Sequence, residues 1–215
     1  MTSVEMKDTG IDWLSQIPAH WKVVPFWSEF SRQKSVGHPT EELLSVYRDY
    51  GVVPKSSRDD NNNKASEDLS TYQLVEQGDL VINKMKSWQG SIAVSQYRGI
   101  VSPAYFEFKH CGKSYSPYLH YLLRSQPYIT AYKSTSKGIR LGQWDQDPDA
   151  LRGIRVVTPP LPEQERIADY LDRETGRLDA LVAEQENFPT TLPRAITKIQ
   201  ACPAMPIASG PEYSP

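Results

Sequence analysis

Near the C-terminus of this 215-residue chain, three closely spaced prolines are followed by a stretch that favours a long helix. Pro159-Pro160 and Pro162 are followed by residues 163–186, which contain no proline and a single glycine. Proline suits the first turn of a helix and breaks its interior, and acidic residues such as Glu163 favour a helix N-terminus through the macrodipole. The sequence therefore predicts one long helix within residues 159–188.

This predicted helix carries only a narrow apolar stripe. Its larger aliphatic residues fall three, four or seven positions apart, at Ile167, Leu171, Leu178, Leu181 and Val182. Most other positions between 161 and 188 are polar, with eight acidic and three basic residues. Such a stripe is typical of a coiled-coil-like contact, so we predict that these residues bind a partner, which includes a second copy of the chain. The alternative is a helix folded back on its own domain.

The sequence on either side of the helix has a different character. The chain as a whole has 39% hydrophobic and 23% charged residues, which is typical of a globular protein. We expect residues 1–158 to form one domain. Residues 189–215 contain six prolines, which prevent a regular helix or strand. We predict that this segment is a disordered tail.

Several classes of protein are excluded by composition. No apolar run reaches about 18 residues, so no membrane span is expected, and the N-terminus lacks the apolar core of a signal peptide. The two cysteines, Cys111 and Cys202, and the four histidines show no metal-ligand spacing. We predict a cytoplasmic protein with no metal site.

The domain reads as a mixture of short strands and helices, which predicts the α+β class. Residues 80–82 form a short apolar run after a Gly-Asp turn signal, and residues 91–97 and 100–108 alternate as strands do. Other predicted elements are a strand pair within 43–53, helices over 118–125 and 127–133, a short helix capped by Asp147 and a strand over 154–157. We expect loops at 10–30, 54–68 and 134–144, the last of them rich in glycine, serine and basic residues.

Charge is unevenly distributed along the chain. The formal net charge is only −2, but residues 80–144 contain nine Lys and Arg and a single acidic residue, Glu107. The flanking segments 1–79 and 161–188 each carry a net charge of −5. A basic block that includes aromatic and amide side chains is typical of a nucleic-acid-binding surface, because lysine and arginine displace condensed counterions from phosphates. The alternative is an ordinary solvated basic face.

Six residues of this block are the candidate DNA contacts. Lys84 and Lys86 follow a strand end, where loops present side chains outward, and Arg140 and Gln143 lie in the basic loop. Arginine, lysine and amide side chains are the types that read base edges in the major groove. Lys133 and Lys137 are expected to contact phosphates, which position a protein without specifying sequence. For each residue, solvated charge is the competing interpretation, and no catalytic group is proposed.

The sequence resembles a known family over residues 8–187. The run Gly78-Asp79-Leu80-Val81-Ile82-Asn83-Lys84-Met85 and the run Pro159-Pro160-Leu161-Pro162-Glu163-Gln164 are similar to segments of type I restriction-modification specificity subunits. Further similar segments occur in the same order. They are residues 9–14 with 17–21, 42–46 with 50–54, 99–105, 138–141 with 143–144, and 165–168 with 171–172.

The resemblance implies a target recognition domain that binds double-stranded DNA, followed by a spacer helix. In such systems the helix binds methyltransferase subunits, and the restriction subunit joins through the complex. S-adenosylmethionine, ATP and magnesium then belong to those partners and not to this chain. In agreement, the sequence has no Gly-x-x-x-x-Gly-Lys-Ser/Thr loop and no Gly-x-Gly-x-x-Gly turn.

Three interpretations remain open on the sequence. Family members contain two recognition domains and two helices, whereas one of each is found here, which fits a half-subunit that pairs with a copy of itself or a truncated product. A stand-alone nuclease or methyltransferase is the enzymatic alternative, and Asp79 with Lys84 and Lys86 is the nearest approach to a metal site. The third is a module that binds partner subunits and blocks their assembly.

Overall fold

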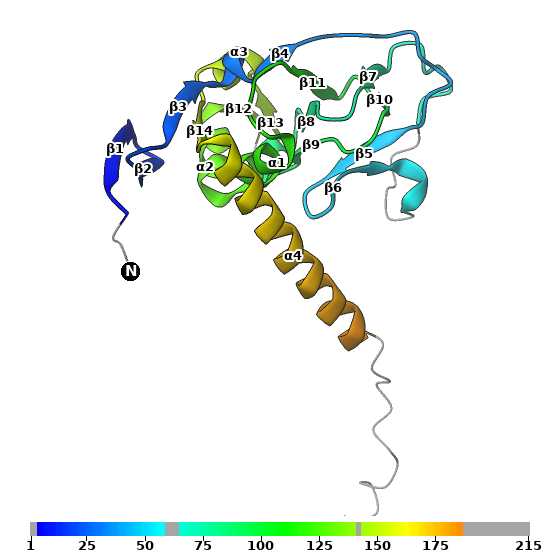
Figure 1. The fold of residues 1–215 in the computed structure, drawn as a ribbon. Coiled ribbons are helices and arrows are strands. Elements are labelled where there is room, and N and C mark those ends of the chain that lie inside the picture. Colours follow the sequence, from blue (N-terminus) through cyan, green and yellow to red (C-terminus); the bar gives the residue numbers. More distant parts are fainter. Residues whose placement is uncertain (1–3, 59–64, 141–142, 187–215) are drawn as a thin grey trace, which may run out of the picture. The chain divides into compact units, whose positions relative to one another are not determined.

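The structure is a computed structural model that describes residues 4–58, 65–140 and 143–186, with the backbone alone for 136–140, 143–145 and 186 (Figure 1). The strands are β1 (Met6–Ile11), β2 (Leu14–Pro18), β3 (Lys22–Pro25), β4 (Phe30–Arg32), β5 (Leu44–Tyr47), β6 (Gly51–Pro54), β7 (Gln73–Val75), β8 (Leu80–Asn83), β9 (Ile92–Val94), β10 (Gly99–Val101), β11 (Tyr105–His110), β12 (Ser136–Arg140), β13 (Gln143–Gln146) and β14 (Arg155–Thr158). The α-helices are α1 (Ser116–Arg124), α2 (Gln126–Thr135), α3 (Pro148–Arg152) and α4 (Leu161–Glu186). Short 3-10 turns cover Phe26–Ser28, Lys55–Ser57 and Ser87–Gln89.

A four-stranded antiparallel sheet in the order β4-β11-β8-β9 lies at the centre of the domain. Successive side chains along each strand point to opposite faces of the sheet. Phe106 and Phe108 of β11 belong to one buried cluster, and Tyr105 packs against another. Glu107 shares the face of Tyr105 and is also buried. Both faces of the sheet are therefore covered, and the predicted α+β class is confirmed.

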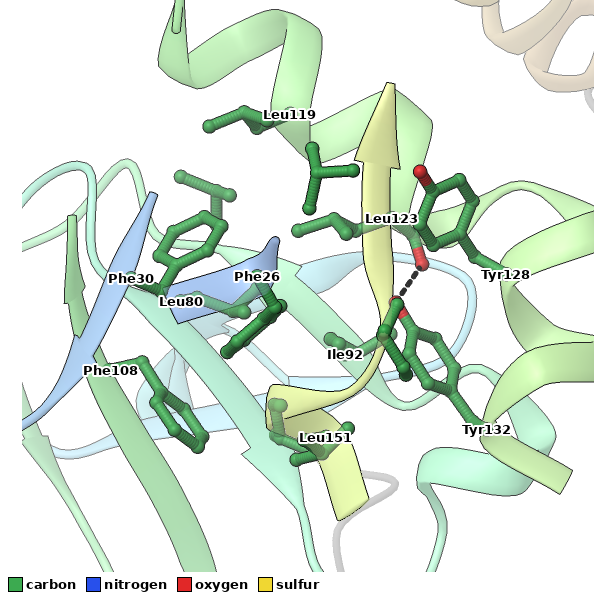
Figure 2. Close-up of a cluster of buried hydrophobic side chains, with 14 of the residues drawn as sticks. Phe26, Phe30, Leu80, Ile92, Phe108, Leu119, Leu123, Tyr128, Tyr132 and Leu151 are labelled. Carbon is green, nitrogen blue, oxygen red and sulfur yellow. Dashed lines mark hydrogen bonds between the residues drawn. The ribbon is translucent and has the colours of Figure 1, made fainter. Parts of the chain in front are cut away.

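The main core fills the space between the sheet and helices α1 and α2 (Figure 2). In it Phe26 and Phe108 pack edge to face, with their ring centroids 5.4 Å apart. Tyrosines enter this core only with their hydroxyls bonded: Tyr132 donates to the carbonyl of Leu123 at 2.9 Å (dashed in Figure 2), and Tyr118 donates to that of Val157 at 3.0 Å. A buried hydroxyl without a partner would destabilise the fold, which explains this pattern.

The beginning and end of the domain are held together by strand pairing. Strand β3 pairs antiparallel with β14, so that Val24 lies opposite Val156. Residues 10–30 were expected to form a loop, but β1 and β2 form a hairpin there and β3 follows. The expectation failed because two tryptophans suggested irregular packing. One of them, Trp13, does pack on the domain, 4.9 Å from the ring centroid of Tyr128.

Two further expectations need correction. Residues 100–108 form two strands, β10 and β11, because Pro103 has no N–H for a ladder and a turn forms in which Tyr105 N donates to Ser102 O at 3.1 Å. The loop expected over 134–144 is instead the end of α2 followed by the β12–β13 hairpin. Glycine and serine suggested a loop, but backbone pairing between the two arms prevailed. The helix capped by Asp147 is confirmed as α3.

Helix α4 runs from Leu161 to Glu186, close to the prediction. The chain divides into two compact units at Asp172, so the first turns of α4 belong to the unit that contains the sheet. Gln164 anchors them, because its Nε2 donates to Pro159 O at 2.8 Å and its Oε1 accepts from Tyr115 N at 2.7 Å. The division into residues 1–158 and 159–188 stays a prediction, and the predicted disordered tail, 189–215, lies outside the described residues. Among the described helices, none is long and apolar enough to span a bilayer.

Candidate nucleic-acid interface

A hollow of about 610 Å³ lies beside the loop that joins β8 to β9. Segments far apart in the sequence line it. They are Leu43, Leu44, Ser45, Lys55, Ser66, Tyr72, Asn83, Met85, Lys86, Trp88, Gln89, Ser102, Ala104 and Tyr105. The lining combines two lysines, two amides and three aromatic rings, the residue types that proteins use on phosphates and bases.

The β8–β9 loop is held in one shape by its own hydrogen bonds. Asn83 Oδ1 accepts from Met85 N at 3.0 Å and from Lys86 N at 3.2 Å. Trp88 Nε1 donates to Met85 O at 3.0 Å. The loop closes at Gly90, whose φ of 93° lies in the left-handed region that glycine occupies without strain. The loop thus has its own internal hydrogen bonds, and it leaves the side chains of Met85, Lys86 and Gln89 exposed.

Comparison with known proteins gives one kind of match. No protein-family model and no curated protein matches the sequence. Solved structures do match: one from a study of complex assembly and conformational transition in the type I R-M system is 17% identical with a TM-score of 0.53. The HsdS subunit from Thermoanaerobacter tengcongensis is 16% identical with a TM-score of 0.50, and the type I S subunit from M. genitalium 16% identical with 0.51.

The fold is that of a type I specificity subunit. The match covers 84%, 85% and 76% of this chain but only 44%, 43% and 41% of the three solved chains, so the chain spans less than half of each. At this identity the comparison bears on the fold alone. At the level of the fold, the comparison confirms the family resemblance that we inferred from sequence segments occurring in the same order.

On the specificity-subunit fold, the two predicted lysines of the β8–β9 loop have different surroundings. Lys86 is exposed and lines the hollow. Lys84 is half-buried, donates through Nζ to Pro103 O, and lies 4.7 Å from the ring centroid of Phe106. Lys84 therefore packs along β11, because the strand end that was expected to present it outward is followed by a turn.

The other predicted contacts lie on α2 and the β12–β13 hairpin. Lys133 is exposed near the end of α2. Lys137 lies on β12, and Arg140 pairs with Gln143 across the end of the hairpin. The side chains of these three hairpin residues lie outside the described part of the structure, so their role as DNA contacts stays a prediction.

Residues that the sequence analysis missed also line the hollow. Lys55 follows β6, in the 3-10 turn Lys55–Ser57, and Gln89 ends the turn Ser87–Gln89. Lys55 was missed because it belongs to the acidic segment 1–79, where a count of charge along the chain hides it. Gln89 was visible in the basic block, but no local signal distinguished it from other amides.

The basic block does not act as a single surface. Arg98 is paired with Glu41 at 2.9 Å and with Glu76. Arg124 donates to the carbonyls of Arg48 and Asp49, at 2.7 Å and 3.0 Å, and so fastens the β5–β6 turn to α1. These two arginines serve the fold. The positively charged surface that the block leaves for a ligand is correspondingly smaller than its net charge suggests.

Two carboxyl groups near the sheet, those of Asp79 and Glu107, are buried. Asp79 accepts from Glu76 N at 2.8 Å through Oδ2 and from His110 N at 3.2 Å through Oδ1. Glu107 is 3% exposed, and burial, together with the negative charge of Asp79, raises its pKa to about 8. A carboxyl that keeps its proton near neutral pH is a poor metal ligand, so Glu107 is poorly suited to share a metal ion with Asp79. Lys84, half of the lysine pair considered with Asp79, donates elsewhere.

The predicted partner stripe on α4 is not uniform. Ile167 is half-buried and packs against the main core, and Leu171 is half-buried. Leu178, Leu181 and Val182 are 60%, 50% and 56% exposed. The first part of the stripe therefore helps to anchor the helix, and the exposed part supplies the remaining candidates for partner binding. The carboxylate of Glu163 binds His20 and Trp21, at 2.8 Å and 3.2 Å, as expected of a structural role rather than a metal ligand.

Proposed function

We propose that this chain reads duplex DNA as the specificity component of a type I restriction-modification system. The observation that supports it is the hollow, in which Lys55, Lys86 and Gln89 converge from distant segments on the fold of a specificity subunit. Lysines contact phosphates and guanine, and glutamine pairs bidentately with adenine in the major groove. The side chains that line the hollow are thus suited to contact the phosphates and the base edges of duplex DNA.

The surrounding predicted contacts extend this surface. Lys133 on α2 and Lys137 on β12 contact phosphates, whereas Arg140 and Gln143 at the end of the β12–β13 hairpin enter a groove. The rigid loop and the hairpin then supply base contacts from two directions. Lys84 contributes to the fold and to the local potential more than to direct contact.

In this proposal the chemistry resides on partner subunits. Methyltransferase subunits hold S-adenosylmethionine, and a restriction subunit that joins through the complex holds ATP and magnesium. Both carboxylate oxygens of Asp79 accept hydrogen bonds from the backbone, and the pKa of Glu107 is raised. These observations favour catalysis on partner subunits over a stand-alone nuclease. The chain itself is non-catalytic.

Selection from a random duplex library tests the proposal. The full chain, alone and with a type I methyltransferase subunit from the same organism, is incubated with the library, and the bound duplexes are sequenced. We expect enrichment of a defined half-site, with binding that weakens steeply as salt rises. Absence of enrichment in both samples would overturn the proposal. Magnesium-dependent cleavage by the chain alone would support the nuclease alternative instead.

Helix α4 provides the assembly surface in this proposal. Leu178, Leu181 and Val182 are exposed on it, and apolar side chains at such spacing stabilise a helical partner, either a methyltransferase subunit or a second copy of the chain. A homodimer brings two reading units together, one for each half of a bipartite site.

Replacing Leu178 and Leu181 together by aspartate tests this surface. We expect the double variant to lose capture of the methyltransferase subunit and self-association by at least about 10-fold, because each buried leucine contributes roughly 1.5–3 kcal/mol. Pull-down and sedimentation velocity measure the two effects. Ala180→Asp, an exposed change on the side of the same helix away from the stripe, is the control.

Unchanged capture and unchanged self-association in the double variant would contradict the assignment. Capture of the methyltransferase subunit without any DNA selection by the complex would favour the module that blocks assembly.

A further inference from the structure

Gln146 is a buried polar residue that joins two parts of the proposed reading surface. It is the last residue of β13 and is 2% exposed. Its Oε1 accepts from Ser87 Oγ at 3.0 Å, and its Nε2 donates to Thr135 Oγ1 at 3.0 Å. Its backbone N donates to Lys84 O at 3.0 Å. One residue thus contacts the β8–β9 loop twice and the end of α2 once.

The same bonds hold the first residue of β12 and the last residue of β13 in place. Strand β12 begins directly after Thr135, and Ser136 pairs with Gln146 at the open end of the hairpin. Farther along, Gly138 pairs with Trp144 and Arg140 with Gln143. The orientation of the whole hairpin therefore depends on how its open end is fastened to the β8–β9 loop.

The partner of Gln146 in the loop is itself fully buried. Ser87 is 0% exposed and lies between the exposed residues Lys86 and Gln89. A buried amide and hydroxyl stabilise a structure little beyond what an apolar pair of the same size would give, but their hydrogen bonds allow only one relative placement. The pair acts as a joint with a defined geometry rather than as a source of stability.

We propose that Gln146 is a positioning residue for sequence recognition: it sets the β12–β13 hairpin against the β8–β9 loop so that both reach the same duplex. This inference rests on the proposed DNA-reading function. Bidentate base contacts tolerate little displacement, whereas phosphate contacts by flexible lysines tolerate more. Loss of the joint is therefore expected to reduce discrimination between sequences and to leave salt-dependent binding intact.

The experiment compares Gln146→Met with Gln164→Met in the full chain. Gln164 is also buried and also bonded through both ends of its amide, but to Pro159 and Tyr115. For each variant, affinity is measured for the duplex enriched by the wild-type chain and for a scrambled duplex of the same composition, across a range of salt. The ratio of the two affinities is the readout, because a smaller folded fraction lowers both equally.

We expect Gln146→Met to lower this ratio by about 10-fold or more, the loss of at least one good base contact, with the salt slope unchanged. Gln164→Met keeps the wild-type ratio. Ser87→Ala, which removes one bond and adds no volume, shows the same loss in smaller degree and serves if Gln146→Met does not fold. Thr135→Ser keeps the hydroxyl and behaves as wild type.

A wild-type ratio in both Gln146→Met and Ser87→Ala overturns the inference while leaving the proposed function standing. If the wild-type chain enriches no duplex at all, the proposed function fails and the inference fails with it.

Discussion

Replacing Lys55 and Lys86 together by alanine is expected to weaken binding of the enriched duplex on the order of 50-fold at 0.1 M salt. Both lysines line the hollow, although Lys55 belongs to the acidic segment 1–79 and Lys86 to the basic block 80–144. Each lysine that neutralises a phosphate contributes about 0.9 to the slope of log K against log salt, so the slope falls by about 1.8. Fluorescence anisotropy over a salt series measures both quantities.

The matched control keeps the charge. Lys55→Arg with Lys86→Arg retains two cations in the hollow, and we expect it to keep the wild-type salt slope. Lys22→Ala removes an exposed lysine of β3 that does not line the hollow, and we expect it to bind as wild type. If the double alanine variant retains the wild-type slope, the hollow is not the DNA-binding surface.

Replacing Glu107 by glutamine is expected to stabilise the domain in alkaline solution on the order of 5 kcal/mol, from the size of its pKa shift. Burial raises the pKa of Glu107 in the folded chain to about 8, above its ordinary value of 4.5. The folded state therefore holds the proton more tightly than the unfolded state does. The stability that this proton supplies is complete below pH 4.5 and is lost as pH rises to about 8.

Urea unfolding of both proteins between pH 5 and pH 9 measures the difference. The amide has no such proton to lose, so the two free energies of unfolding should lie close together at pH 5 and diverge toward pH 9. Glu165→Gln, on the exposed part of the first turns of α4, is the control and should track the wild type. A constant gap between wild type and Glu107→Gln at every pH would show that the carboxyl is not held protonated.

Much of the fold was accessible from the sequence because local patterns carried it. The apolar run Leu80-Val81-Ile82 becomes the buried strand β8, and Asp147 caps α3 through bonds to Asp149 N and Ala150 N. The alternation of Tyr105 and Glu107 with Phe106 and Phe108 places these pairs on opposite faces of the sheet, as strand geometry dictates.

Other elements were missed because long-range pairing decided them. Nothing within residues 134–144 distinguishes a basic loop from a hairpin, since the choice depends on where Thr135 and Gln146 are fastened. Strand β3 likewise exists because β14, over 130 residues later, supplies its hydrogen-bonding partner.

The candidate site shows the same division more sharply. Charge along the chain identified Lys86 but also selected Lys84, which packs on Phe106, and passed over Lys55. It counted Arg98, whose charge Glu41 and Glu76 balance. A linear count cannot distinguish a cation in a groove from one in an ion pair, because electrostatic effects depend on distance in space.

The sequence by itself determined the long helix, the α+β class and the family resemblance, because proline placement, hydrophobic periodicity and ordered motifs are local properties of the chain. Only the tertiary structure decided which cations line the same hollow and which carboxyl groups are buried. Those outcomes depend on burial and on contacts between segments that no local pattern contains. The hollow beside the β8–β9 loop therefore forms only when the chain folds, because the residues that line it come from segments far apart in the sequence.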